Sequence, residues 1–239
     1  MVFWVGCATP PPSQSYREMS YREILKSVIP MTKRLDTLAR PLRKASIELC
    51  KGEAEDTVVI THTLTDYPQE FQAVAKSLWG LDEQNRIFYI RPDSKPDQGG
   101  LKFGDVVEDK VITDEIGCGY EVRVRIETQA NAYADGERIF VTTGLMNTIK
   151  DLPLSLVIAH EMAHNILGHV KMGISPKTER SADRWAIFLL ARAGLDYEKA
   201  ILDPMSIGTN EDEQERAQHF KQVAAEIKRL REQNLFLKP

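Results

Sequence analysis

Residues 151–170 read DLPLSLVIAHEMAHNILGHV, and this stretch decides the fold. Leu154 to Val170 would be apolar on almost every side of a helix, so the sequence predicts a buried central helix. Asp151 is expected to cap this helix, and Pro153 is tolerated in its first turn. His160, Glu161 and His164 interrupt the apolar surface. Buried polar groups need partners, so these three side chains are expected to surround a bound partner.

The spacing of these polar residues indicates a metal site. His160 and His164 are four residues apart, which places both imidazoles on one face of a helix, one turn apart. Both can therefore bind a single ion, as in the HExxH pattern of zinc sites. Glu161 lies beside that face, where it can act as a general base towards water. A pair of purely structural histidines is the alternative interpretation.

A third ligand is expected from the next helix, since catalytic zinc usually has three protein ligands and one open position. After a break at 173–176, a second helix is predicted from about Thr178 to Gly194. If the two helices are antiparallel, Glu179 comes to lie opposite the two histidines. Asp183, one turn further, can then accept a hydrogen bond from the outer nitrogen of a ligand histidine. The alternative is a solvated helix start, where acidic residues are favoured without any metal.

The other three histidines are not expected to bind the metal. His169 lies five residues after His164, so it should point away from the metal face and be structural. His62 and His219 have no obvious partner in the sequence and are expected to be ordinary packing or surface residues.

The remaining elements follow from periodicity and turn signals. Apolar residues at three-and-four spacing predict helical structure from Tyr16 to about Cys50, broken at Pro30 and Pro41. Alternating apolar and charged residues predict a half-buried strand at 120–127, and Asp135-Gly136 indicates a hairpin turn. Further strands are expected at 57–63, 86–90 and 138–142, and further helices at 69–78 and 217–230.

Composition limits the class of protein. The chain has 239 residues, with 42% hydrophobic and 28% charged residues and a net charge of −4. Such values are typical of a globular domain with one substantial core. There is no basic block, so we expect no nucleic-acid partner. No apolar run approaches the roughly 20 residues that span a bilayer.

The N-terminal region looks like the end of a bacterial lipoprotein signal. The sequence FWVGCATPPP places Cys7 after an apolar stub and before a proline-rich tether, so residues 1–15 are predicted to be a signal remnant and tether. This predicts a periplasm-facing protein of the bacterial cell envelope, with a lipid anchor at Cys7 as its one membrane contact. An incidental cysteine is the alternative. Export favours a disulfide between Cys50 and Cys118, and two free thiols are the alternative.

Another segment carries a weaker likeness. Residues 100–105, GLKFGD, resemble the Gly-Leu-x-x-Gly-Asp signature of PDZ domains. Only about thirty residues surround it, fewer than a PDZ domain needs. The sequence therefore predicts a truncated, β-rich PDZ-like insert at about 84–116.

Several pieces of the chain together resemble one family, the gluzincin endopeptidases of the HtpX-like and CAAX-prenyl-protease-like kind. The likeness is closest to bacterial lipoprotein members with an inserted PDZ domain, for which Cys118-Gly119-Tyr120 and GLKFGD look like the two sides of the insert. The pieces that carry the family resemblance are Asn131–Ala134, Ile139–Leu145, His160–His169 and Glu179–Asp183.

The resemblance implies an α+β fold, with a mainly helical zincin-like core and a small antiparallel sheet, occupying residues 16–239 around the insert. It implies one Zn²⁺ held by His160, His164 and Glu179, with Glu161 as general base. It also implies that the strand near Asn131 and Ala132 is the edge along which polypeptide substrates add as an extra strand.

One departure from the family affects the expected activity. Asn210 stands where the family often has a histidine that helps to stabilise the oxyanion, and Arg216 follows as a possible substitute or a structural ion-pair partner. The leading hypothesis is a zinc endopeptidase acting on unfolded or misassembled envelope proteins. The alternatives are a zinc-stabilised chaperone-like module with little or no proteolysis, and a peptide-binding scaffold that uses residues 86–113.

Overall fold

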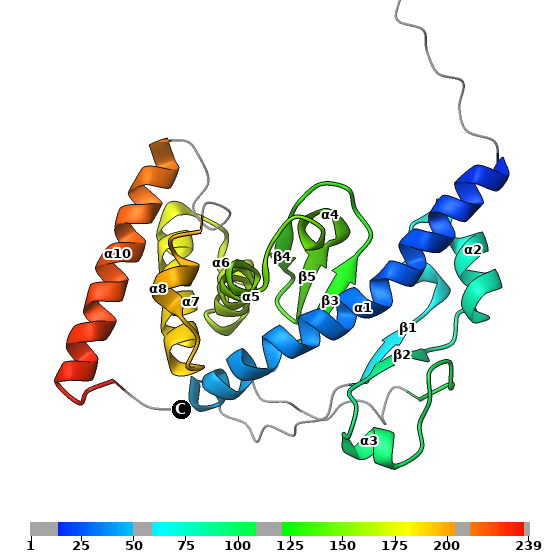
Figure 1. Cartoon of the computed structure of the whole chain (residues 1–239), viewed down its shortest axis with the longest axis horizontal. Helices are drawn as coiled ribbons and strands as arrows, with labels where there is room; N and C mark the ends of the chain where they lie inside the picture. The colour runs from blue at the N-terminus through cyan, green and yellow to red at the C-terminus, as the bar shows by residue number, and fades with distance from the viewer. Residues whose placement is uncertain (1–13, 50–58, 109–120, 204–210, 237–239) are drawn as a thin grey trace, which may run out of the picture.

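The computed structural model describes residues 14–49, 59–108, 121–203 and 211–236. Helix α1 (Gln14–Ser46) runs across the molecule, with a small sheet at one end and the helices of the predicted metal region at the other (Figure 1). The short elements are η1 (Ile47–Leu49), η2 (Leu64–Asp66), α3 (Lys95–Gln98), α4 (Thr143–Met146), α6 (His169–Met172) and α8 (Tyr197–Ala200). The fold is mixed helical with two small sheets, in agreement with the predicted α+β class.

Helix α1 passes through both of its prolines, so the predicted breaks at Pro30 and Pro41 are wrong. A proline inside a helix removes one backbone hydrogen bond and strains the preceding turn. Here tertiary packing outweighs that cost, because Leu25, Leu35 and Leu42 are fully buried along one side of the helix. The helix therefore stays continuous, and elements from both ends of the molecule pack against it.

The central sheet is mixed, whereas the sequence predicted an antiparallel one. Its order is β3 (Glu121–Arg125), β5 (Arg138–Thr142), β4 (Ala132–Ala134). Strand β4 pairs antiparallel with β5 through the predicted hairpin, but β3 pairs parallel with β5. Alternating polarity predicted a half-buried strand at 120–127, but it carries no information on the direction of the neighbouring strand.

The direction is set by the segment that joins β3 to β4. This segment crosses the end of β5, where the Thr142 hydroxyl donates to the Gln129 carbonyl (2.7 Å) and the Thr143 hydroxyl donates to the Glu127 carbonyl (2.8 Å). Gly144 is required beside them, because any Cβ there would collide with the Thr128 carbonyl. The chain thereby crosses to the other edge of the sheet, where it continues as β4, antiparallel to β5.

Helix α5 (Asp151–Ile166) is the predicted buried helix, and it ends four residues earlier than expected. Gly168 adopts a left-handed conformation (φ 70°), which only glycine adopts without strain, and the chain restarts as the short helix α6. Lys150 is the N-cap residue, and Asp151 lies in the first turn. The core around α5 also contains residues from α1, β3, β5 and from α7 (Pro176–Arg192).

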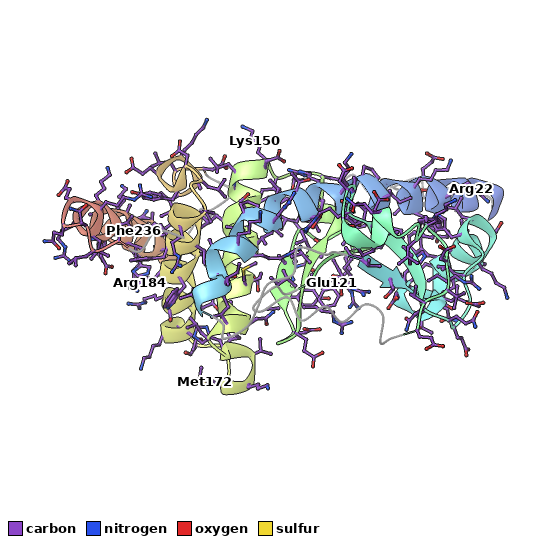
Figure 2. All side chains as sticks on the ribbon, turned by 90° about the horizontal axis from the view of Figure 1, so that it is seen from below. Arg22, Glu121, Lys150, Met172, Arg184 and Phe236 are labelled. Atoms are coloured by element: carbon purple, nitrogen blue, oxygen red, sulfur yellow. The ribbon has the colours of Figure 1, made fainter. Side chains whose placement is uncertain are left out.

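Helix α10 (Glu211–Glu232) packs against α7 on the outside of the molecule. Arg184 of α7 donates to both carboxylate oxygens of Glu226 (2.6 and 3.2 Å). Phe188 stacks on Phe236, with ring centroids 5.9 Å apart. Figure 2 shows Arg184 and Phe236 at the same end of the molecule. The last helix is thus held in place beside the predicted third ligand.

At the other end, β1 (Val59–His62) pairs antiparallel with β2 (Arg86–Ile90), and α2 (Gln69–Trp79) lies beside them. On the other side of β2, Arg86 forms an antiparallel bridge with Val106. The segment predicted as a PDZ-like insert therefore shares its sheet with β1, which lies outside the predicted bounds. Its description as a truncated PDZ domain stays a prediction.

Several predictions fall on residues outside the described ranges. These are the lipid anchor at Cys7, the pairing of Cys50 with Cys118, and the position of Asn210. No helix among the described residues has the length and apolar character needed to span a bilayer.

The small sheet contains a buried histidine within a cluster of aromatic rings. His62 is 4% exposed, and its Nδ1 lies 2.7 Å from the Tyr67 hydroxyl. The rings of Phe88, Trp79 and Phe103 have centroids 4.7, 5.5 and 6.0 Å from that of His62. Burial lowers the pKa of His62 to about 4, so the ring is neutral at pH 7. His62 is a packing residue, as the sequence predicted.

This burial predicts a pH-dependent stability. The unfolded chain binds a proton at His62 near pH 6.5, whereas the folded chain binds it near pH 4. The stabilisation is therefore complete above pH 6.5 and is lost as the pH falls towards 4, by about 3 kcal/mol at most. Urea unfolding at pH 7 and pH 4.5 should show a smaller difference for His62→Phe than for the wild type. The half-buried His219→Gln variant is the control, and an equal difference in all three proteins would refute the prediction.

Candidate metal centre

Helices α5 and α7 bring the three predicted ligands together. The Nε2 atoms of His160 and His164 lie 3.0 Å apart. The two carboxylate oxygens of Glu179 lie 3.4 Å from His160 Nε2 and 3.3 Å from His164 Nε2. All three side chains thus present one ligand atom each to a common point, within 4.8 Å of one another. Ser175 caps α7, and this turn places Glu179 one turn into the helix, opposite the histidines.

The donor set and its dimensions fit zinc. Two ligands at about 2.0 Å from a tetrahedral Zn²⁺ are about 3.3 Å apart, close to the three separations found here. Two imidazoles and one carboxylate form a set found in catalytic zinc sites, which leaves a fourth position open. The surroundings favour positive charge: burial alone lowers the pKa of His160, but Asp183 and Glu179 outweigh it and raise that pKa to about 9.

Asp183 lies behind His160, as the sequence predicted. Its Oδ1 is 2.8 Å from His160 Nδ1, so the proton of this ring is directed away from the metal position and Nε2 is left to bind the ion. Arg216 of α10 donates to both oxygens of Asp183, with Nε at 2.9 Å and a terminal nitrogen at 2.6 Å. Burial opposes ionisation of Asp183, but His160 and Arg216 hold its pKa below the usual value.

Arg216 is therefore placed as an ion-pair partner of Asp183, one of the two roles that the sequence left open for it. A polar cavity of about 580 Å³ lies beside this pair, between α7 and α10. Glu179 and Arg216 both line it, together with Arg180 and His219. His219 Nε2 lies 3.0 Å from the Arg180 carbonyl, so His219 contacts α7 rather than the ligand atoms.

Glu161 has the surroundings of a general base. Burial raises its pKa to about 7, helped by the negative charge of Glu179 and opposed by His160 and by a hydrogen bond from the Ala134 N–H. A carboxylate with a pKa near 7 both accepts and releases a proton readily at neutral pH. A bound dication would add positive charge and favour the ionised form that accepts the proton.

His169 lies against the second ligand, which the sequence reasoning missed. Its Nδ1 is 3.2 Å from His164 Nδ1. If His164 binds the ion through Nε2, its Nδ1 carries the proton, and the neutral His169 ring, whose pKa burial lowers, can accept it. The spacing of five residues pointed away from the metal face of a continuous helix. The break at Gly168 turns the chain and brings His169 back onto His164.

We expect His169→Phe to lower zinc affinity about tenfold, because the phenyl ring cannot accept the His164 proton that fixes the ligand tautomer. His169→Gln restores an acceptor and should recover part of the loss. Competition with a chromophoric chelator measures the affinity, and His219→Phe serves as the control. Wild-type affinity in His169→Phe would contradict this assignment.

The edge strand predicted to receive substrate lies beside this centre. Asn131 and Asp135 bond to β5, since Thr142 N donates to the Asn131 carbonyl and Asp135 N to the Arg138 carbonyl. In an antiparallel pair these groups alternate, so the backbone groups of Ala132 and Ala134 face the outer edge. Strand β4 packs against α5, the helix that carries Glu161 and the two histidines. Of the two predicted contacts, Ala132 thus begins the strand β4, and Asn131 directly precedes it.

One comparison with known proteins, the match to a family model, agrees with this geometry. The model of the peptidase family M48 matches residues 115–177, about a quarter of the chain. No curated protein and no solved structure matches the chain. The matched residues include β3 to β5, all of α5 and the pentapeptide from His160 to His164, and they end just before Glu179. Family M48 consists of metal-dependent peptidases, typically with zinc, so the match and the His160–His164–Glu179 cluster together support a metallopeptidase.

Proposed function

We propose that this protein is a zinc-dependent endopeptidase that hydrolyses peptide bonds in unfolded polypeptides. The observation that carries the proposal is the cluster of His160, His164 and Glu179, with Glu161 next to His160 on α5 and β4 packed against that helix. Zn²⁺ held by these ligands would supply Lewis-acid chemistry at the open position.

Side chains of the protein would then carry out the proton transfers and orient the ligands. Glu161 takes a proton from the attacking water and later gives it to the leaving amine nitrogen. Asp183 and His169 orient the two ligand rings from behind. Proton transfer and ligand orientation are thus each assigned to a side chain near the metal position.

The substrate is proposed to be an extended polypeptide that adds to β4 as a further strand. Main-chain hydrogen bonds to an edge strand depend little on side-chain identity, which favours unfolded chains of many sequences. With a lipid anchor at Cys7, the substrates would be unfolded or misassembled proteins of the bacterial cell envelope.

A zinc-stabilised binding module with little proteolysis is the second candidate. One observation favours it: Arg216, the cation considered for oxyanion stabilisation, already makes two hydrogen bonds to Asp183. A chain-holding protein would keep the same ligands and edge strand without turnover.

The test is a cleavage assay with one substrate protein in two states. Zinc-loaded protein should cut the denatured substrate, lose this activity with a zinc chelator and regain it with added Zn²⁺. The natively folded substrate should stay intact, because its backbone is not free to add to β4. No cleavage of the denatured substrate at full zinc occupancy would reject the peptidase.

A further inference from the structure

The residue after the second histidine joins the metal helix to the edge strand. Asn165 lies in the last turn of α5 and is 6% exposed. Its Oδ1 accepts a hydrogen bond from the Gly136 N–H (2.9 Å), and its Nδ2 donates to the Arg138 carbonyl (3.1 Å). Both groups of the buried amide are therefore bonded to the turn between β4 and β5.

The turn that Asn165 binds is tightly closed. Asp135 N donates to the Arg138 carbonyl (3.1 Å), and the Asp135 carboxylate accepts from the backbone N–H of Arg138 (2.6 Å). A Cβ added at Gly136 would lie 3.9 Å from Val170 of α6, so the same turn also packs near the chain that follows the metal helix. A shift of Asn165 would therefore move the turn and β4 together.

We propose that Asn165 is a positioning residue that sets the register of the β4 edge relative to the metal ligands. The inference rests on the proposed function, since it assigns Asn165 to the alignment of a substrate strand. The chain distances are short: Asn165 is next to His164, and Gly136 is two residues from Ala134, the last residue of β4. The two hydrogen bonds of Asn165 thus fix the end of the β4–β5 hairpin to α5 at two points, Gly136 and Arg138.

The link from Asn165 to β4 matters because the alignment of the substrate with the reacting groups controls the rate of cleavage. A displacement of about 1 Å between a substrate and the reacting groups can cost about a hundredfold in rate. A substrate strand takes its position from β4, whereas the reacting groups sit on α5 and α7. A displacement of β4 relative to α5 therefore moves the scissile bond away from the reacting groups, even though Asn165 contacts neither substrate nor metal.

The experiment compares Asn165→Ala, which removes both bonds, with Asn165→Asp, which keeps the acceptor for Gly136, and with the exposed control Asn147→Ala. We expect kcat/KM of Asn165→Ala to fall 10- to 100-fold, through a higher KM as well as a lower kcat, with zinc affinity within threefold of the wild type. Mass spectrometry of the products of one denatured substrate should show cuts displaced by one or two residues. Asn165→Asp should give an intermediate result, and Asn147→Ala should match the wild type.

A purely structural role predicts something different: fewer folded molecules, with the same cleavage positions and the same KM, and this result would overturn the proposal. Should the wild type bind chains without cutting them, the proposed function fails but the coupling remains testable. In the Glu161→Gln background, Asn165→Ala should weaken binding of an extended peptide about tenfold and speed amide exchange at residues 132–136. Unchanged binding and exchange would overturn the inference independently of catalysis.

Discussion

Replacement of Glu161 by Gln should lower kcat by about 10²- to 10⁴-fold and leave zinc binding unchanged. The amide has nearly the same shape as the carboxylate, but it cannot take a proton from water or return it to the leaving amine. Glu161 is not among the three ligand residues, so the ion keeps all of its protein donors. The measurement is the rate of cleavage of a denatured protein, together with the zinc content of the purified variant.

The same variant separates the two candidate functions. A peptidase loses turnover in Glu161→Gln but still binds its substrate, whereas a binding module behaves alike in both forms. Glu179→Gln is the matched control, because it is the same chemical change at a proposed zinc ligand and should lower zinc affinity. Equal cleavage rates in wild type and Glu161→Gln, at equal zinc content, would remove Glu161 from the mechanism.

The parts of this site that the sequence predicted are those fixed within one helix or by one short turn. His160 and His164 share a face because of helical spacing alone. Glu179 and Asp183 follow with the same regularity once the α5–α7 turn is assumed, and the structure places both beside the histidines. Helix capping at Ser175 is local as well, which is why the approximate start of α7 was predictable.

The parts that could not be predicted depend on contacts between distant residues or on a break within a helix. His169 reaches His164 only because the chain turns at Gly168, although glycine before a histidine was a visible signal of that break. The parallel pairing of β3 with β5 depends on how Thr142 and Thr143 hold residues 127–131. The role of Asn165 needed the positions of two elements at once.

Asp183→Asn is the change expected to affect both zinc binding and stability. Asp183 Oδ1 lies 2.8 Å from His160 Nδ1 on one side, its carboxylate accepts from Arg216 on the other, and the residue is 3% exposed. The neutral amide keeps the size but loses the charge that orients the His160 ring, so zinc affinity should fall about 10- to 100-fold. Arg216 also loses its charged partner, which should destabilise the metal-free protein by about 1–3 kcal/mol.

Two measurements separate these effects: competition with a chelator for zinc affinity, and urea unfolding of the metal-free protein. Arg216→Met should reproduce most of the loss of stability, because the guanidinium bonds α10 to α7 through Asp183. It should reproduce less of the loss of zinc affinity, because the Asp183 carboxylate still faces His160 in that variant. If Arg216→Met lowered zinc affinity as much as Asp183→Asn, the arginine would be acting on the ligand set itself. The double variant Asp183→Asn/Arg216→Met should show no larger loss than the single variants, since both changes break the same chain of contacts from α10 to the metal position.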